Sequence, residues 1–147
     1  MSPPNQLSPI QTSYREYAIR IGVPPEKIQL NETPADNGAA HIECIGSELC
    51  YVVTERGREL DRRRTENPDL LLYWLISDLT HALASSHAAK LRRQSEDFRR
   101  MLFAKQLELL GTIKEEWRER RAEEIAVVLA TNPYRDSKPL ESKPETQ

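Results

Sequence analysis

Three kinds of hydrophobic pattern follow one another along the chain. Near its start, apolar residues recur at intervals of three and four positions and predict a short helix; they are Tyr14, Tyr17, Ala18 and Ile21. The prolines and scarce apolar groups of residues 1–10 predict a loose arm before this helix. Residues 23–38 hold prolines, a glycine and an Asn-Gly pair, which is typical of loop.

Residues 40–45 and 49–55 predict a β-hairpin, because both are rich in β-branched, aromatic and cysteine residues. The Gly46-Ser47 pair between them is typical of a two-residue turn. A third extended segment through residues 58–64 is compatible with the pattern. The middle of the chain therefore predicts a hairpin or a small antiparallel sheet.

Three longer helical patterns fill the second half of the chain. The first begins at Asn67-Pro68, a capping residue followed by proline at the first helical position, and extends to about Lys90. The second and third begin near Ser95 and Thr112, both of which can cap a helix N-terminus.

These elements predict one α+β domain over residues 1–136. A short N-terminal helix and a β-hairpin or small antiparallel sheet would be followed by a three-helix C-terminal bundle. The loose arm would occupy residues 1–10, the helix and hairpin 11–66, and the three helices 67–136. Residues 137–147 are mostly polar and predict a disordered tail.

The composition narrows the class of protein. The 147 residues are 38% hydrophobic and 30% charged, which is typical of a soluble globular chain. The longest apolar run, residues 70–76, is far shorter than the ~20 residues that cross a bilayer. No secretory signal pattern is visible, and two cysteines are too few for a disulfide scaffold. We therefore expect a cytoplasmic protein with no membrane association.

The charge is distributed unevenly. Residues 26–59 hold seven acids and three bases, a local net charge of −4, whereas residues 60–135 hold twelve acids and fourteen bases. The arginine pairs of the second region are interleaved with acids, so we expect solvated faces with local ion pairs and no nucleic-acid partner. The acidic region could suit a basic protein partner or be an ordinary solvated surface.

No catalytic or metal-binding motif is present in the sequence. His41, Cys44 and Cys50 could suggest zinc, but no close cysteine pair or fourth ligand accompanies them, so packing residues are favoured. A Cys44–Cys50 disulfide is disfavoured, because the predicted turn pairs Cys44 with Leu49. We expect no metal, no cofactor and no catalytic residues, and a small hydrolase or transferase is the least favoured class.

Asp78 is unusual because it lies in an apolar stripe, four residues after Trp74 and seven after Leu71. A buried carboxylate must be paired or hydrogen-bonded. We expect Arg99 or Arg100, from the next helix, to supply that partner. The role of the three residues would be structural.

Five segments within residues 67–136 carry a resemblance to a known family. They are the run Leu-Leu-Tyr-Trp-Leu-Ile-Ser-Asp-Leu-Thr of residues 71–80, the Asp97-Phe98-Arg99-Arg100 block with Met101-Leu102-Phe103, the Lys105-Gln106 pair, Trp117, and Asn132-Pro133-Tyr134-Arg135-Asp136. In these segments the chain resembles the immunity protein 63 family of bacterial polymorphic toxin systems.

The resemblance implies a protein without catalytic residues that binds and neutralises a toxin encoded beside it. In the acidic hairpin, composition favours four contact residues for such a partner: Glu43, Glu48, Tyr51 and Glu55. The alternative is a non-catalytic intracellular adaptor or regulatory subunit that docks through its helical face.

Overall fold

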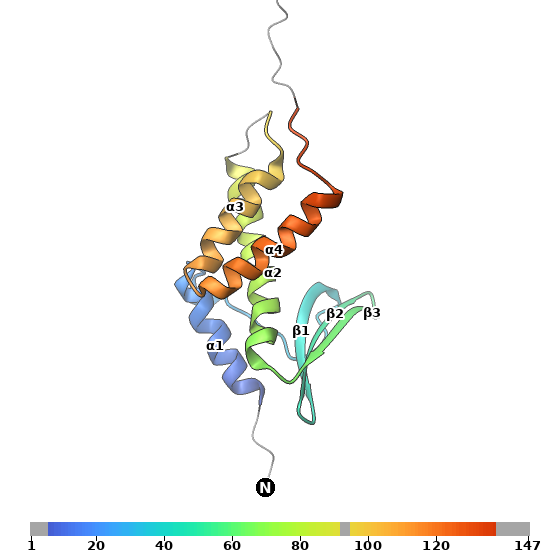
Figure 1. Ribbon diagram of the computed structural model, residues 1–147. Helices are drawn as coiled ribbons and strands as arrows, with labels where there is room; N and C mark the ends of the chain where they lie inside the picture. Colours follow the sequence, from blue (N-terminus) through green and yellow to red (C-terminus); the bar gives the residue numbers. More distant parts are fainter. Residues whose placement is uncertain (1–5, 92–94, 138–147) are drawn as a thin grey trace, which may run out of the picture. The chain divides into compact units, whose positions relative to one another are not determined.

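The computed structural model describes residues 6–91 and 95–137 (Figure 1). The elements in chain order are helix α1 (Leu7–Arg20), the 3-10 turn η1 (Pro25–Lys27), strands β1 (Asn37–Ile45), β2 (Glu48–Glu55) and β3 (Arg58–Thr65), and helices α2 (Pro68–Lys90), α3 (Phe98–Gly111) and α4 (Glu115–Thr131). The α+β class is confirmed. The chain divides within α2 into two compact units, unit 1 (residues 1–78) and unit 2 (residues 79–147). The single domain stays a prediction.

Helix α1 begins earlier than the sequence pattern predicted. It starts at Leu7, and Ile10 is buried with Tyr14 and Ala18 along one line of the helix. A loose arm extending to residue 10 is therefore wrong. Pro9 is compatible with this early start because it lies in the first turn, where a backbone N–H has no helical acceptor. The rest of the predicted arm, residues 1–5, and most of the predicted tail lie outside the described residues.

The three strands form an antiparallel sheet in the order β1-β2-β3. Two-residue turns join them, and both turns use left-handed backbone: φ is +63° at Gly46, and +52° and +75° at Arg56 and Gly57. The register places Cys44 opposite Leu49, which confirms the predicted turn. The third strand is also confirmed. Strand β1 begins three residues earlier than predicted, at Asn37.

The buried side chains of unit 1 come from α1, the sheet and the first half of α2. They include Ile10, Tyr14 and Ala18 of α1, Ile42, Leu49, Tyr51 and Val52 of the sheet, and Leu71, Leu72, Tyr73, Leu75 and Ile76 of α2. Almost all of these residues are apolar or aromatic, so burial of apolar surface drives the folding of this unit.

In unit 2, the end of α2 packs with α3 and α4 around one apolar cluster. Its buried members are Ala84, Ala88, Leu102, Phe103 and Ile125. Beside it, the fully buried Gln106 amide donates to the Thr80 hydroxyl at 3.3 Å and accepts from Arg121 Nε at 3.0 Å. These bonds satisfy an amide that would otherwise be costly to bury.

The helix starts agree only partly with the predicted caps. Asn67 caps α2 as expected, since its side-chain oxygen accepts from the Asp69 N–H at 2.9 Å. The Ser95 cap is wrong, because Asp97 accepts from the Arg99 N–H and α3 begins at Phe98. The Thr112 capping box is also wrong, because that hydroxyl donates back to a carbonyl of α3 and Lys114 is the residue before α4.

No helix within residues 6–91 and 95–137 combines the length and apolar character that crossing a membrane requires.

Candidate partner-binding surface

The four predicted contact residues do not form one patch. Glu48 and Glu55 are exposed, but they stand at the two ends of β2, seven positions apart. That spacing corresponds to about 23 Å along an extended strand. Tyr51 is only 4% exposed, so its ring belongs to the core, which contradicts its predicted role as a contact residue. Tyr51 was chosen from composition, which cannot tell the covered face of a strand from the open one.

Glu43 is half-buried and joins a polar chain across the sheet. It accepts from His41 Nε2 at 2.7 Å and from the Arg62 guanidinium at 3.1 Å. Arg62 also pairs with Glu59 at 2.8 Å. The hydrogen bonds from His41 and then Arg62 hold the pKa of Glu43 below its usual value. The carboxylate of Glu43 is therefore engaged within the sheet, in a structural ion pair.

Tyr51 connects the sheet to α2 within unit 1. Its hydroxyl donates to the Asp78 carboxylate, and its ring meets Trp74 edge-on with centroids 6.2 Å apart. The Arg63 guanidinium lies 4.5 Å from the centre of the Tyr51 ring. Burial and then the bond to Asp78 raise the pKa of Tyr51 above its usual value.

The expected environment of Asp78 is therefore wrong in two respects. The residue is exposed, although helical spacing placed it in an apolar stripe. Its partner is the Tyr51 hydroxyl, and the guanidinium groups of Arg99 and Arg100 bond to acceptors of unit 2.

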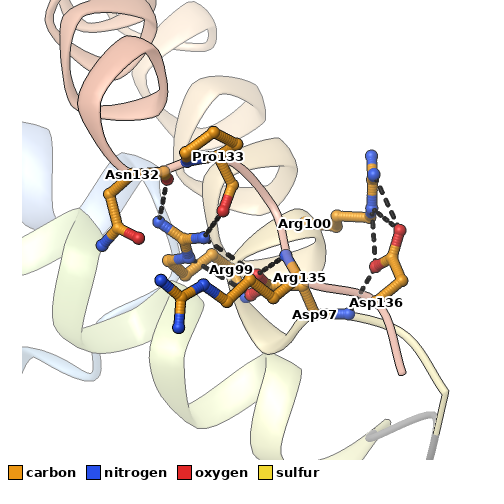
Figure 2. A network of polar contacts seen from close by, with 7 residues as sticks. All are labelled: Asp97, Arg99, Arg100, Asn132, Pro133, Arg135 and Asp136. Atoms are coloured by element: carbon orange, nitrogen blue, oxygen red, sulfur yellow. Dashed lines mark hydrogen bonds and ion pairs between the residues drawn. The ribbon is translucent and has the colours of Figure 1, made fainter.

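Arg99 and Arg100 belong to a network that we call the polar clasp: Asp97, Arg99, Arg100, Asn132, Pro133, Arg135 and Asp136 (Figure 2). Arg99 pairs with Asp97 at 2.9 Å and donates to the carbonyls of Asn132 and Pro133 at 2.9 and 2.8 Å. Arg100 pairs with Asp136 at 2.8 Å. The clasp thus fastens the segment after α4 to the start of α3.

Backbone N–H groups from both segments of the clasp also form hydrogen bonds across it. The Asp97 N–H donates to Asp136 at 2.7 Å, and the Arg135 N–H donates to Asp97 at 2.8 Å. The Arg99 guanidinium, and then the backbone N–H groups of Arg135 and Arg99, hold the pKa of Asp97 far below its usual value. Arg100, and then the Asp97 amide, lower the pKa of Asp136. Both carboxyls are therefore ionised at neutral pH.

Tyr134 lies against Arg99 and Arg100 of the clasp. The Arg100 and Arg99 guanidinium carbons are 4.1 and 5.5 Å from the centre of its ring. The Asp-Phe-Arg-Arg block and the Asn-Pro-Tyr-Arg-Asp segment are thus partners in space. The sequence contained both segments, but nothing in either one indicated that they meet.

Neither metal nor disulfide chemistry is evident around the sheet. Over the described parts of the chain, no three histidine, cysteine or acidic side chains lie close enough to hold a metal ion. Cys50 is buried, and both cysteines are free thiols. The Cys44 thiol donates to the Gln6 side chain at 3.2 Å.

Glu43, Asp97 and Asp136 each pair with an arginine, so this is a small α+β protein with internal ion pairs. The family model for immunity protein 63 matches residues 46–127, more than half of the chain. The chain therefore belongs to the immunity protein 63 family. No curated protein and no solved structure matches it significantly.

The matched region extends from the turn before β2 into α4. It includes Glu48, Glu55, Asp97, Arg99 and Arg100. Glu43 and the segment after α4 lie outside it, so the clasp joins a matched block to a segment beyond the match.

Proposed function

We propose that this protein is an immunity protein that binds a cognate bacterial toxin and neutralises it by direct protein–protein contact. The observation that supports this most strongly is membership of the immunity protein 63 family over β2, β3, α2, α3 and most of α4. The partner would be the toxin domain encoded nearby.

Three carboxyl groups in the polar networks are better suited to structure and binding than to proton transfer. A general acid or base works best with a pKa near the operating pH. Instead, arginine or histidine partners lower the pKa values of Glu43, Asp97 and Asp136. Carboxyls in this state stabilise structure and contribute charge, but they are poor proton donors at neutral pH.

We also propose that the protein acts in the cytoplasm. Its two cysteines are free thiols, a state that a reducing compartment maintains. A protein that blocks a toxin inside the producing cell would meet the toxin there.

Glu48 and Glu55 remain the proposed acidic contacts, each at its own end of β2. If either meets a basic toxin surface, replacing both with alanine slows association and weakens its dependence on salt. Stopped-flow association rates at low and high salt would measure this. Unchanged rates at every salt concentration would remove both residues from the interface.

Growth rescue tests the proposed function itself. The toxin domain encoded immediately upstream is expressed in a susceptible bacterium, with and without this protein. Rescue together with a co-purifying complex is the expected result. Persistent toxicity in cells that contain the folded protein would contradict the proposal.

The second candidate function is an adaptor that docks through its helices. It is favoured by two exposed valines on α4, Val127 at 69% and Val128 at 41% exposure. Replacing both with serine would abolish adaptor docking. Toxin neutralisation that survives this change would separate the two functions.

A further inference from the structure

Strand β3 forms an edge of the sheet (Figure 1). Among the described residues it pairs only with β2, through an eight-residue strand. An edge strand presents unpaired N–H and C=O groups to which another chain can add a strand. The direction of each backbone group on β3 therefore decides what the edge can bind.

The register fixes those directions. A two-residue turn is closed by a hydrogen-bonded pair, here Ile45 with Glu48, and bonded pairs then alternate along the strands. Every second residue of β2 thus bonds to β1, and the residues between them bond to β3. Tyr51 is one of the latter, and it stands opposite Arg63. Arg63 therefore bonds inward, and its neighbours Arg62 and Arg64 point their N–H and C=O groups outward.

Two independent observations agree with this assignment. The second turn is closed by Glu55 and Arg58, which places Glu55 in the same alternating set as Tyr51. On the opposite edge of the sheet, the rule directs the Ile42 N–H away from β2. That N–H donates to the carbonyl of Asn31 at 2.9 Å, as the rule requires.

The side chains of β3 favour an acidic occupant. The strand holds four arginines and two acids, and both acids are already paired, Glu59 with Arg62 and Asp61 with Arg63. Arg58 and Arg64 have no carboxylate within ion-pair distance in the described parts of the chain. Two unneutralised guanidinium groups thus stand near the two ends of the edge.

The β3 edge does not consist of charged side chains alone, because it also exposes Leu60. Charged side chains on an edge strand commonly prevent unwanted pairing between copies. Leu60 is 57% exposed at the register shift between β2 and β3, and it offers one apolar contact on a strand that is otherwise mostly charged. Pairing of two β3 strands would bring arginine-rich strands together, so a second copy of this chain is disfavoured.

We propose that the β3 edge receives an extended, acidic segment of the toxin, which adds a fourth strand to the sheet. Outward groups of Arg62 and Arg64 bond to its backbone, the unneutralised Arg58 and Arg64 attract its carboxylates, and Leu60 supplies an apolar contact. This inference rests on the proposed function and names the surface that performs it.

Amide hydrogen exchange tests the strand addition directly. The ¹⁵N-labelled protein is compared alone and in complex with the toxin domain encoded immediately upstream. In the free protein, the Arg62 and Arg64 amides exchange fast, whereas Arg63 and Thr65 are protected by β2. In the complex, exchange at Arg62 and Arg64 becomes at least about tenfold slower.

The outcomes separate this inference from the function on which it rests. Fast exchange at Arg62 and Arg64 in a stable complex overturns the strand addition and leaves the immunity function standing. Failure of the two proteins to form any complex contradicts the immunity function itself, and the strand addition with it.

A matched pair of variants isolates the backbone contribution. Arg64→Ala removes the side chain beyond Cβ and keeps the backbone N–H, whereas Arg64→Pro also removes this outward N–H, which β2 does not use. We expect Arg64→Pro to raise the Kd for the toxin domain about tenfold more than Arg64→Ala. Equal effects of the two variants would overturn a backbone contact. The hydrogen-exchange experiment uses the unsubstituted chain, so it tests the strand addition even if the proline variant fails to fold.

Discussion

The backbone N–H of Asp97 donates to the Asp136 carboxylate at 2.7 Å, although the two residues are 39 positions apart. Asp97 in turn accepts from the N–H of Arg135 at 2.8 Å. The start of α3 is therefore held by the segment that follows α4, through backbone as well as side-chain groups. This reciprocity makes the polar clasp a structural lock of unit 2, and its charges make that lock dependent on pH.

The first prediction concerns acid unfolding of unit 2. The folded-state pKa values of Asp97 and Asp136 lie below their ordinary values. The stabilisation that they supply is thus present above about pH 4, near the unfolded pKa of an aspartate, and is lost as the pH falls below it. Replacing both by asparagine should lower Tm at pH 7 and flatten its dependence on acid pH, as followed by circular dichroism.

A surface ion pair provides the control for that experiment. Glu115 pairs with Arg118 on the exposed side of α4, and Arg118 lowers its pKa as well. An isolated exposed pair contributes little, so Glu115→Gln should leave the melting curve close to that of the parent. A clasp variant that melted like Glu115→Gln across the whole pH range would contradict a locking role.

The second prediction concerns the buried amide of unit 2. Gln106 bonds to Thr80 and Arg121 and is fully buried. Gln106→Leu keeps the volume nearly constant but removes one hydrogen bond from each of these two polar side chains, which should cost about 1–3 kcal/mol in the free energy of unfolding. Urea titration would measure the loss. Glu108→Ala, on the exposed side of α3, should change stability by no more than about 0.5 kcal/mol.

The third prediction concerns the turn between β2 and β3. Arg56 has a φ of +52°, a left-handed conformation that costs a side chain like arginine roughly 1 kcal/mol. Asparagine tolerates this conformation better, so Arg56→Asn should raise the free energy of unfolding by about 0.5 kcal/mol. Arg58→Asn, placed in the strand proper, should give no such gain. Equal gains from both changes would mean that backbone strain is not the cause.

The parts of the fold that the sequence predicted are those governed by local rules. The Gly46-Ser47 turn needed only a glycine that could adopt positive φ, and the register of Cys44 opposite Leu49 followed from the length of the turn. The Asn67 cap likewise depends on groups two residues apart. Rules of this kind need only the residues of one short stretch of the chain, and these can be read directly from the sequence.

The parts that could not be predicted depend on which segments meet. Helical spacing placed Asp78 on an apolar stripe, but spacing cannot tell where that stripe stops being covered, and the residue is exposed. Its partner, Tyr51, lies 27 positions earlier on the sheet. Arg99 was expected to pair with Asp78, but the carboxylate that it uses belongs to Asp97, only two positions away. The sequence did not single out the β3 edge. It shows the four arginines of β3, but not which of them lie beside a carboxylate.

The last prediction concerns Tyr51 and alkaline pH. Burial and the bond to Asp78 raise the folded-state pKa of this phenol above its ordinary value. The stabilisation that results is therefore fully present below about pH 10, the ordinary pKa of tyrosine, and is lost as the pH rises above it. Tyr51→Phe keeps the ring against Trp74 and removes the hydroxyl. We expect it to cost about 1.5–3 kcal/mol at pH 7, the usual range for a hydrogen bond to a charged group.

The same substitution should remove the alkaline part of the stability profile, because phenylalanine has no proton to lose. Urea titrations at neutral and alkaline pH would measure both effects. Tyr17→Phe is a suitable control, since that residue is a tyrosine of α1 that lies outside the contact between Tyr51 and Asp78. A phenylalanine there should leave the alkaline slope of the parent intact. If stability still fell at alkaline pH in Tyr51→Phe but no longer did so in Tyr17→Phe, Tyr51 would not be the group responsible for the alkaline loss of stability.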